Sequence, residues 1–415
     1  MTTTETAPGG AEVADRWLRN LWVCTAGSFT TAVAMTLLIP FLPVYVRQLG
    51  VSDDAGVLFW SGVAYAATFL TAALTAPLWG SLGDRYGRKS MLIRASLGMS
   101  VAMSLIGLAQ SVWQLVVLRL LVGLLGGYSS ASTILVAADS PVERRGWGLG
   151  VLSSGIMAGS IVGPLLGGLL PQVIGIRLTF LLTGALIFLA FLATALLVTE
   201  DRPRAAGLAL TRAGDADGPR ARDLRGRGIG VLLLTGSMVM FATMSVEPLV
   251  TEYVALLDGA AHATVWAGVV MSLGALGAIV SAPFVGRLAD RHGPRRVIVG
   301  CLLAAAACLV VQGLVDGVGQ LAAARLLMGV SLGGLMPAVT AALRACAPPG
   351  RVGRLLGWSV SAQYVGDVTG PVLGGLAAGV LGMRSVFAAT AVVLLAAALL
   401  HAVPAMRVRT ASARV

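Results

Sequence analysis

The chain has 415 residues, of which 57% are hydrophobic and only 12% are charged, and its formal net charge is +11. Soluble domains carry about 25% charged residues, so this composition excludes a water-soluble globular protein. The apolar residues form blocks of membrane-spanning length rather than short repeats or charged heptads, which also excludes collagen-like, coiled-coil and disordered chains. We therefore expect an all-α membrane protein.

Twelve apolar blocks follow one another along the chain, and each is long enough to form one transmembrane helix. The predicted helices cover residues 20–46, 57–79, 91–110, 112–138, 147–171, 178–198, 229–253, 264–285, 297–315, 318–343, 354–380 and 384–404. The segment before the first block is polar, and the block itself is longer than the apolar region of a signal peptide. We therefore expect the first helix to remain in the membrane.

Basic residues gather on one side of the predicted membrane. Because the number of helices is even, both termini lie on the same side, and 25 of the 30 Lys and Arg residues lie on that side, in its tails and loops or at the helix ends next to them. The positive-inside rule places this side in the cytoplasm. The net charge then reflects topology and contact with anionic lipid headgroups. We expect no nucleic-acid partner, because no basic block carries interleaved aromatic residues.

Cysteine and histidine residues give no pattern typical of a metal site or an active site. The four cysteines lie in or at the ends of predicted helices without a CxxC pair, and the three histidines are scattered. The sequence has no Ser/His/Asp or HExxH arrangement. We expect packing roles for the cysteines, no metal, no cofactor and no enzymatic activity.

The two halves of the chain repeat one another at an offset of 206 or 207 residues, about half its length. The matching residues are Gly80, Asp84, Arg85 and Gly87 with Gly286, Asp290, Arg291 and Gly293; Gln114, Leu115, Arg119 and Gly123 with Gln320, Leu321, Arg325 and Gly329; and Gly163, Pro164, Gly167 and Gly168 with Gly370, Pro371, Gly374 and Gly375. A repeat of this kind is typical of a pseudosymmetric transporter. The predicted organisation is a cytoplasmic tail over 1–19, a six-helix bundle over 20–198, a cytoplasmic linker over 199–228, a second bundle over 229–404 and a cytoplasmic tail over 405–415.

These motifs resemble those of the major facilitator superfamily. The segment from Gly80 to Lys89 resembles the signature between helices two and three of that family, and the segment from Asp290 to Arg296 is similar to its second-half echo. Pro40 to Pro43 resembles a motif of the twelve-helix drug:proton antiporter branch. The resemblance implies two pseudosymmetric six-helix bundles that export hydrophobic small molecules by proton antiport and alternating access.

The resemblance also implies a cytoplasmic latch between the halves. In the family, the residue matching Asp84 faces the positive N-terminus of helix eleven, and the residue matching Arg88 reaches an acid at the end of helix four, where this chain has Asp139. The full set of expected latch residues is Gly80, Asp84, Arg85, Gly87, Arg88, Asp139, Asp290 and Arg291. The alternative is a solvated loop whose charges reflect topology alone.

Helix five carries a row of glycines. Gly155, Gly159, Gly163 and Gly167 recur every four residues and give one smooth face, which favours close helix packing. Pro164 removes a backbone hydrogen bond and can kink the helix. With Gly168, this run resembles the motif associated with exporters in the superfamily.

Charged residues inside the predicted helices are the candidate proton-coupling sites. Arg119 takes part in coupling if the family resemblance holds, although it and Arg325 could both bracket backbone carbonyls. Asp367 falls near the bilayer midplane, and Glu247 falls in the outer third of helix seven. The alternative for both acids is a structural partnership with Arg119 or Arg325.

A polar stripe beside these acids is the candidate substrate cavity. Gln363 and Tyr364 lie one helical turn from Asp367, and Thr243 and Met244 lie one turn from Glu247. Tyr128 is a further candidate from the first half, with core packing as the alternative.

Two other functions stay open from the sequence. The first is a proton-linked or passive metabolite transporter on the same scaffold, and the second is a transporter-like membrane sensor or scaffold. Heavy use of Arg, Ala and Gly with a single Lys is typical of a GC-rich bacterial genome, so we expect the protein in a bacterial cytoplasmic membrane. We also expect it to be a monomer.

Overall fold

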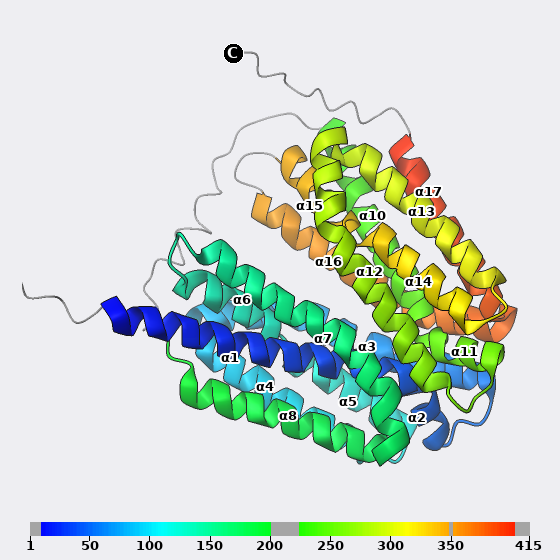
Figure 1. Ribbon diagram of the computed structural model, residues 1–415, viewed down its shortest axis with the longest axis horizontal. Helices are drawn as coiled ribbons and strands as arrows, with labels where there is room; N and C mark the ends of the chain where they lie inside the picture. Colours follow the sequence, from blue (N-terminus) through cyan, green and yellow to red (C-terminus); the bar gives the residue numbers. More distant parts are fainter. Residues whose placement is uncertain (1–9, 201–223, 348–351, 403–415) are drawn as a thin grey trace, which may run out of the picture. The chain divides into compact units, whose positions relative to one another are not determined.

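The computed structural model describes residues 10–200, 224–347 and 352–402, and every regular element in these residues is helical (Figure 1). The described helices supply twelve candidate membrane spans, which confirms the predicted all-α membrane fold. The chain divides into two compact units: unit 1 comprises Met1–Val51 and Ala67–Leu208, and unit 2 comprises Ser52–Ala66 and Ala209–Val415. The predicted linker lies largely, and the predicted C-terminal tail entirely, outside the described residues. Residues 10–19 of the predicted N-terminal tail are described, and they belong to helix α1 (Gly10–Leu37).

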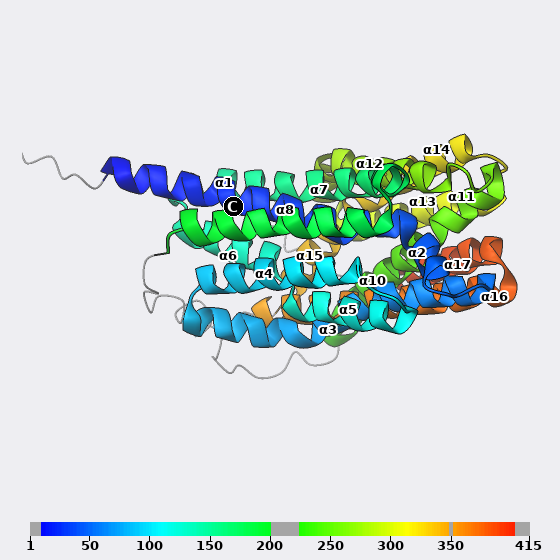
Figure 2. The same ribbon diagram turned by 90° about the horizontal axis from the view of Figure 1, so that it is seen from below.

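Unit 1 is built from helices that lie alongside one another (Figure 2). They are α1 (Gly10–Leu37), η1 (Ile39–Phe41), α2 (Leu42–Gln48), α3 (Asp54–Tyr86), α4 (Arg88–Ile106), α5 (Val112–Leu125), α6 (Tyr128–Asp139), α7 (Arg145–Ile174) and α8 (Ile176–Leu197). The first part of α3, through Ala66, belongs to unit 2.

Unit 2 repeats this order. Its remaining helices are α10 (Leu224–Val246), η2 (Glu247–Leu249), α11 (Val250–Asp258), α12 (Ala263–His292), α13 (Pro294–Leu314), α14 (Val318–Leu332), α15 (Leu335–Cys346), α16 (Val352–Leu381) and α17 (Met383–Ala402).

Four spans are interrupted at equivalent places in the two units. The first and seventh spans each contain a short 3-10 segment with proline as its second residue, Pro40 in η1 and Pro248 in η2. Proline has no backbone N–H to continue the α-helical pattern, so the helix changes there. The fourth and tenth spans are interrupted at glycine pairs, between α5 and α6 and between α14 and α15.

The predicted cytoplasmic loop from Gly80 to Lys89 is mostly helical, so this part of the sequence prediction is wrong. Helix α3 continues through Tyr86, and Gly87 alone separates it from α4, with a φ of 89° that favours glycine. The same holds in unit 2, where α12 continues through His292 and Gly293 has a φ of 84°. Glycines inside a helix weaken it without ending it, whereas the glycine with a positive φ lies outside the helical conformation and ends it.

The glycine row of α7 packs directly on α1. A Cβ at Gly159 would lie 2.6 Å from the carbonyl oxygen of Phe29, and one at Gly167 would overlap the carbonyl oxygen of Leu37. Unit 2 has the same arrangement between α16 and α10, where a Cβ at Gly370 would lie 2.7 Å from the carbonyl oxygen of Phe241. The absent side chains therefore allow the two backbones in each pair to approach closely.

Candidate functional site

A hydrogen-bonded network joins four helices at one end of unit 1. Asn20 of α1 donates from Nδ2 to the carboxylate of Asp139 at 2.5 Å and to the carbonyl oxygen of Thr199 at 2.8 Å. Its Oδ1 accepts from the backbone N–H of Thr199 at 3.1 Å. The end of α6 and the segment after α8 are thereby tied to α1.

Glu200, the next residue, caps helix α4. Its carboxylate accepts from the backbone N–H groups of Arg88 at 2.9 Å and Lys89 at 2.7 Å. The N-cap residue Gly87 has no side chain to do this, and the first N–H groups of a helix have no partner within the helix. The negative carboxylate also suits the positive end of the helix dipole.

We expect the Glu200→Ala variant to loosen the start of α4, because these N–H groups lose their acceptor. Lys89 is the only lysine in the chain, so endoproteinase Lys-C has one cleavage site there. Cleavage in detergent should be several-fold faster in Glu200→Ala than in the wild type. The matched control is Glu143→Ala, which removes an exposed acid, and equal rates in all three proteins would show that the cap does not stabilise the helix.

Two of the expected latch residues, Arg88 and Asp139, are connected through helix α6. Nη1 of Arg88 donates to the carbonyl oxygen of Ile134 at 3.0 Å, in the helix that ends at Asp139. Arg85 lies over the ring of Tyr86 at 5.4 Å, and Gly80, Asp290 and Arg291 are exposed. The side chain of Asp84 lies outside the described part of the chain. Arg88 of α4 therefore contacts α6, the helix that ends at Asp139, and Asn20 of α1 is an additional partner of Asp139.

Arg119 lies in α5 and is fully buried in unit 1. Its backbone carbonyl accepts from the hydroxyl of Thr68 at 3.0 Å. Helices α3 and α5 pack closely there, since a Cβ at Gly123 would overlap the carbonyl of Thr68.

Tyr128 is also buried and shares a hydrogen bond of 2.7 Å with Thr194. Tyr128 is only 1% exposed, which supports the alternative of core packing for this residue.

Asp367 is a half-buried carboxyl in α16. It interacts electrostatically with Tyr364, and it makes no hydrogen bond or ion pair with the residues that the structure describes. Gln363, one turn away, donates from Nε2 to the carbonyl of Ser359 at 3.1 Å. A carboxylate without a partner is costly in an apolar segment, so protonation would stabilise it there.

Glu247 has a different environment. It begins the 3-10 segment η2 and interacts electrostatically with the buried guanidinium of Arg325 in α14. The alternative of a structural partner for Glu247 therefore gains support, with Arg325 as that partner. Thr243 and Met244, one turn before it, are half-buried on α10.

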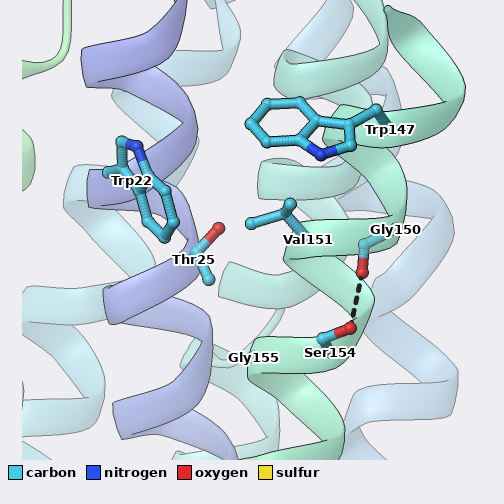
Figure 3. Close-up of a pocket in the computed structure, with 7 residues that line it drawn as sticks. All are labelled: Trp22, Thr25, Trp147, Gly150, Val151, Ser154 and Gly155. Atoms are coloured by element: carbon cyan, nitrogen blue, oxygen red, sulfur yellow. Dashed lines mark hydrogen bonds between the residues drawn. The ribbon is translucent and has the colours of Figure 1, made fainter.

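A shallow groove of about 570 Å³ lies between α1 and α7 (Figure 3). Its lining residues are Trp22, Thr25, Trp147, Gly150, Val151, Ser154 and Gly155. Both hydroxyls bond to carbonyls of their own helices, Thr25 at 2.7 Å and Ser154 at 2.9 Å, so the groove offers aromatic surface and little polar recognition. Tryptophans near a span end are typical anchors at the membrane–water interface.

Sequence reasoning missed Asn20, Glu200 and Gln312. Gln312 is buried in α13, with its Nε2 at 3.2 Å from Sδ of Met328. Each could have been noticed by its position, since Asn20 and Gln312 are amides within apolar blocks and Glu200 is the first acid after the sixth span. Their partners are more than ten residues away along the chain, so no local spacing marks them.

Comparisons with known proteins agree with this architecture. The family model of the Major Facilitator Superfamily matches residues 24–275 and 232–414. Multidrug resistance protein MdtG of Proteus mirabilis (strain HI4320) is 38% identical over 379 residues, which cover 91% of this chain and 93% of that protein. The protein of the same name from Salmonella paratyphi A (strain ATCC 9150 / SARB42) is 36% identical over 386 residues, 93% and 95% of the two chains.

Solved structures share the fold at low sequence identity. A bacterial homologue of the human lysosomal transporter Spinster, in an inward-facing and unoccupied conformation, has a TM-score of 0.71 with 16% identity over 96% of this chain and 97% of its own. The human organic anion transporter MFSD10 has a TM-score of 0.66 with 20% identity over 93% and 99%. The pseudosymmetric helices, the family match and the relatives at 36% and 38% identity show that the chain belongs to the Major Facilitator Superfamily and is a multi-pass membrane transporter, not an enzyme.

Proposed function

We propose that this protein exports hydrophobic small molecules from the cytoplasm in exchange for protons. The observation that carries the proposal is the similarity to multidrug resistance proteins along more than nine-tenths of the chain. Expression of the gene for this protein in a bacterial strain that lacks its own efflux pumps tests the proposal. We expect resistance to rise several-fold for at least one compound in a panel of lipophilic cations and neutral antibiotics, and no rise for any compound would contradict the proposal.

For proton coupling we propose Asp367 first, then Glu247 and Arg119. The half-buried carboxyl of Asp367 faces no cation among the described residues, so a proton is the simplest way to neutralise it. Glu247 has Arg325 as an electrostatic partner, which favours a structural role. Gln363, Tyr364, Thr243 and Met244 form the proposed substrate cavity within unit 2.

The proposed latch consists of Gly80, Asp84, Arg85, Gly87, Arg88, Asp139, Asp290 and Arg291. The contacts of Arg88 with Ile134 and of Asp139 with Asn20 support it in unit 1. The proposed domain boundaries follow the repeat, with bundles over 20–198 and 229–404 and a linker over 199–228. We also propose that the protein is a monomer without a nucleic-acid partner.

The latch predicts that Asp84→Asn lowers transport far more than it lowers protein abundance, because the acid is expected to act through its charge at a helix terminus. Uptake assays in membrane vesicles, normalised to the amount of protein, measure this. The control is Asp258→Asn, an exposed acid at the end of α11. Normal transport by Asp84→Asn at equal abundance would rule out the latch.

The proposed orientation has both termini and Lys89 in the cytoplasm. A membrane-impermeant amine reagent should label this single lysine in inside-out vesicles and leave it unlabelled in intact cells. Labelling in intact cells at the level seen in inside-out vesicles would reverse the orientation.

A further inference from the structure

The repeat allows the surroundings of two buried arginines to be compared. Arg119 of α5 and Arg325 of α14 are related by the offset of 206 residues, and both side chains are buried. A charge in the middle of a membrane protein is costly, so the side chains around each arginine decide how that charge is stabilised.

Two equivalent hydrogen bonds show which positions correspond around them. The hydroxyl of Tyr45 donates to the carbonyl of Ile106 at 2.5 Å, and the hydroxyl of Tyr253 donates to the carbonyl of Gln312 at 2.8 Å. Each tyrosine follows a 3-10 segment and lies beside a phenylalanine of the unit's last span. Ile106 therefore corresponds to Gln312, and Ile39 at the start of η1 corresponds to Glu247 at the start of η2.

The corresponding positions differ in polarity. Unit 1 has Ile39, Ile106 and Val122 where unit 2 has Glu247, Gln312 and Met328. Three aliphatic residues are thus replaced by an acid, an amide and a thioether around Arg325. We call Glu247, Gln312, Arg325 and Met328 the Arg325 cluster.

Several polar atoms of the Arg325 cluster have no hydrogen-bond partner among the described residues. They are Nε and Nη2 of Arg325, which is 6% exposed, and Oε1 of Gln312, which is 0% exposed. The contacts that these side chains do make are to sulfur: Nε2 of Gln312 lies 3.2 Å and Nη1 of Arg325 lies 3.9 Å from Sδ of Met328. Sulfur is a weak acceptor, so it leaves most of the hydrogen-bonding capacity unused.

Glu247 does not supply the missing hydrogen-bond acceptors of Arg325 by direct contact. Its carboxylate interacts electrostatically with Arg325, but the two groups form no ion pair at contact distance. A buried charge is strongly unfavourable unless it is paired and hydrogen-bonded. The guanidinium carries only donors, Oε1 of the amide and the carboxylate oxygens are acceptors, and water can both accept and donate.

We propose that the Arg325 cluster is a water-binding site inside unit 2. The bound water accepts from Nε and Nη2 of Arg325 and donates to Oε1 of Gln312 and to the carboxylate of Glu247. Buried waters in proteins make about three such bonds to polar groups that would otherwise lack partners. This proposal is independent of the proposed export function.

Hydroxyl-radical footprinting by X-ray radiolysis tests the site in the full-length protein in lipid nanodiscs. Radiolysis of a bound water produces radicals beside it, so Met328 should be oxidised although it is only 2% exposed. The matched control is Met103 of unit 1, which is 1% exposed. The hydroxyls nearest to it along α4, those of Ser100 and Ser104, both donate to backbone carbonyls. We expect several-fold faster oxidation of Met328 than of Met103. Chloramine-T, a bulk oxidant larger than water, should oxidise neither.

The variant Gln312→Ile, which introduces the unit 1 residue, should slow radiolytic oxidation of Met328 towards the rate of Met103. Glu247→Ile gives the same test at a half-buried position if Gln312→Ile does not fold. The control variant Gln320→Leu replaces an exposed glutamine and should leave the rate unchanged. Equal oxidation of Met328 and Met103 in the wild type would overturn the proposal. Oxidation of Met328 that persists in both isoleucine variants would overturn it as well, as would oxidation by chloramine-T.

Discussion

We expect the Asp367→Asn variant to lose accumulation of substrate driven by a pH gradient while it keeps downhill exchange. An antiporter must bind a proton and its substrate alternately, and an asparagine amide cannot take up or release that proton. In proteoliposomes with an acidic lumen, accumulation should fall to the level of protein-free liposomes. Counterflow of labelled substrate at equal pH on both sides should remain near the wild-type rate.

Two control variants separate coupling from folding. Asp316→Asn removes an exposed acid that pairs with Arg384 at 3.4 Å, and exposed pairs contribute little, so both assays should be unchanged. Glu247→Gln should reduce both assays together if Glu247 only stabilises Arg325. Full pH-driven accumulation by Asp367→Asn would contradict the assignment and leave Glu247 and Arg119 as the remaining proposed coupling residues.

We expect Gly167→Ala and Gly150→Ala, on the same helix, to change thermal stability in opposite directions. A methyl group at Gly167 overlaps the carbonyl of Leu37, and overpacking costs about 1–3 kcal/mol, or more where backbone must move. Nothing lies within 4 Å of a Cβ at Gly150, so alanine should gain up to about 1 kcal/mol from helix propensity. Thermal unfolding in detergent, followed by size-exclusion chromatography, measures both changes.

The same comparison can be made in unit 2, on helix α16. A Cβ at Gly374 of α16 would overlap the carbonyl of Ser245, whereas a Cβ at Gly357 meets nothing within 4 Å. Gly374→Ala should therefore lower the melting temperature, and Gly357→Ala should not. A stable Gly167→Ala or Gly374→Ala protein would show that the close approach of the helix pairs is not required for folding.

The membrane fold was predictable because it depends on composition and length. Each apolar block is long enough to cross the bilayer, and the repeat at Arg119 and Arg325 relates the two halves. The glycine row at every fourth residue also predicted which face of helix five would approach another helix closely. Its partner α1 was not predictable, since spacing within one helix does not identify the opposite one.

The error at Gly80 to Lys89 has a local cause. Charges and glycines are typical of loops, but the helix ends only at Gly87 with its positive φ, and backbone angles cannot be read from composition. Glu200 was missed for a different reason. It caps a helix that begins more than one hundred residues earlier, so only the folded chain brings the carboxylate to its N–H donors.

The two candidate acids show which properties of the functional site can be predicted from the sequence. Both Glu247 and Asp367 were recognisable as charges within apolar helices. Which of them has a cation in its surroundings depends on tertiary structure, and in the structure Glu247 interacts electrostatically with Arg325 of another helix. That distinction supports the ranking of Asp367 before Glu247, because the charge of Arg325 offsets part of the cost of a charged Glu247.

Proton movement driven by substrate tests the central claim most directly. Purified protein is reconstituted in liposomes that contain a pH-sensitive dye, and a gradient of a transported compound from the resistance panel is imposed at equal pH. Proton antiport predicts that protons move against the direction of substrate flux, and that the signal disappears in Asp367→Asn. Protons that move with the substrate, or substrate flux without any proton movement, would contradict it.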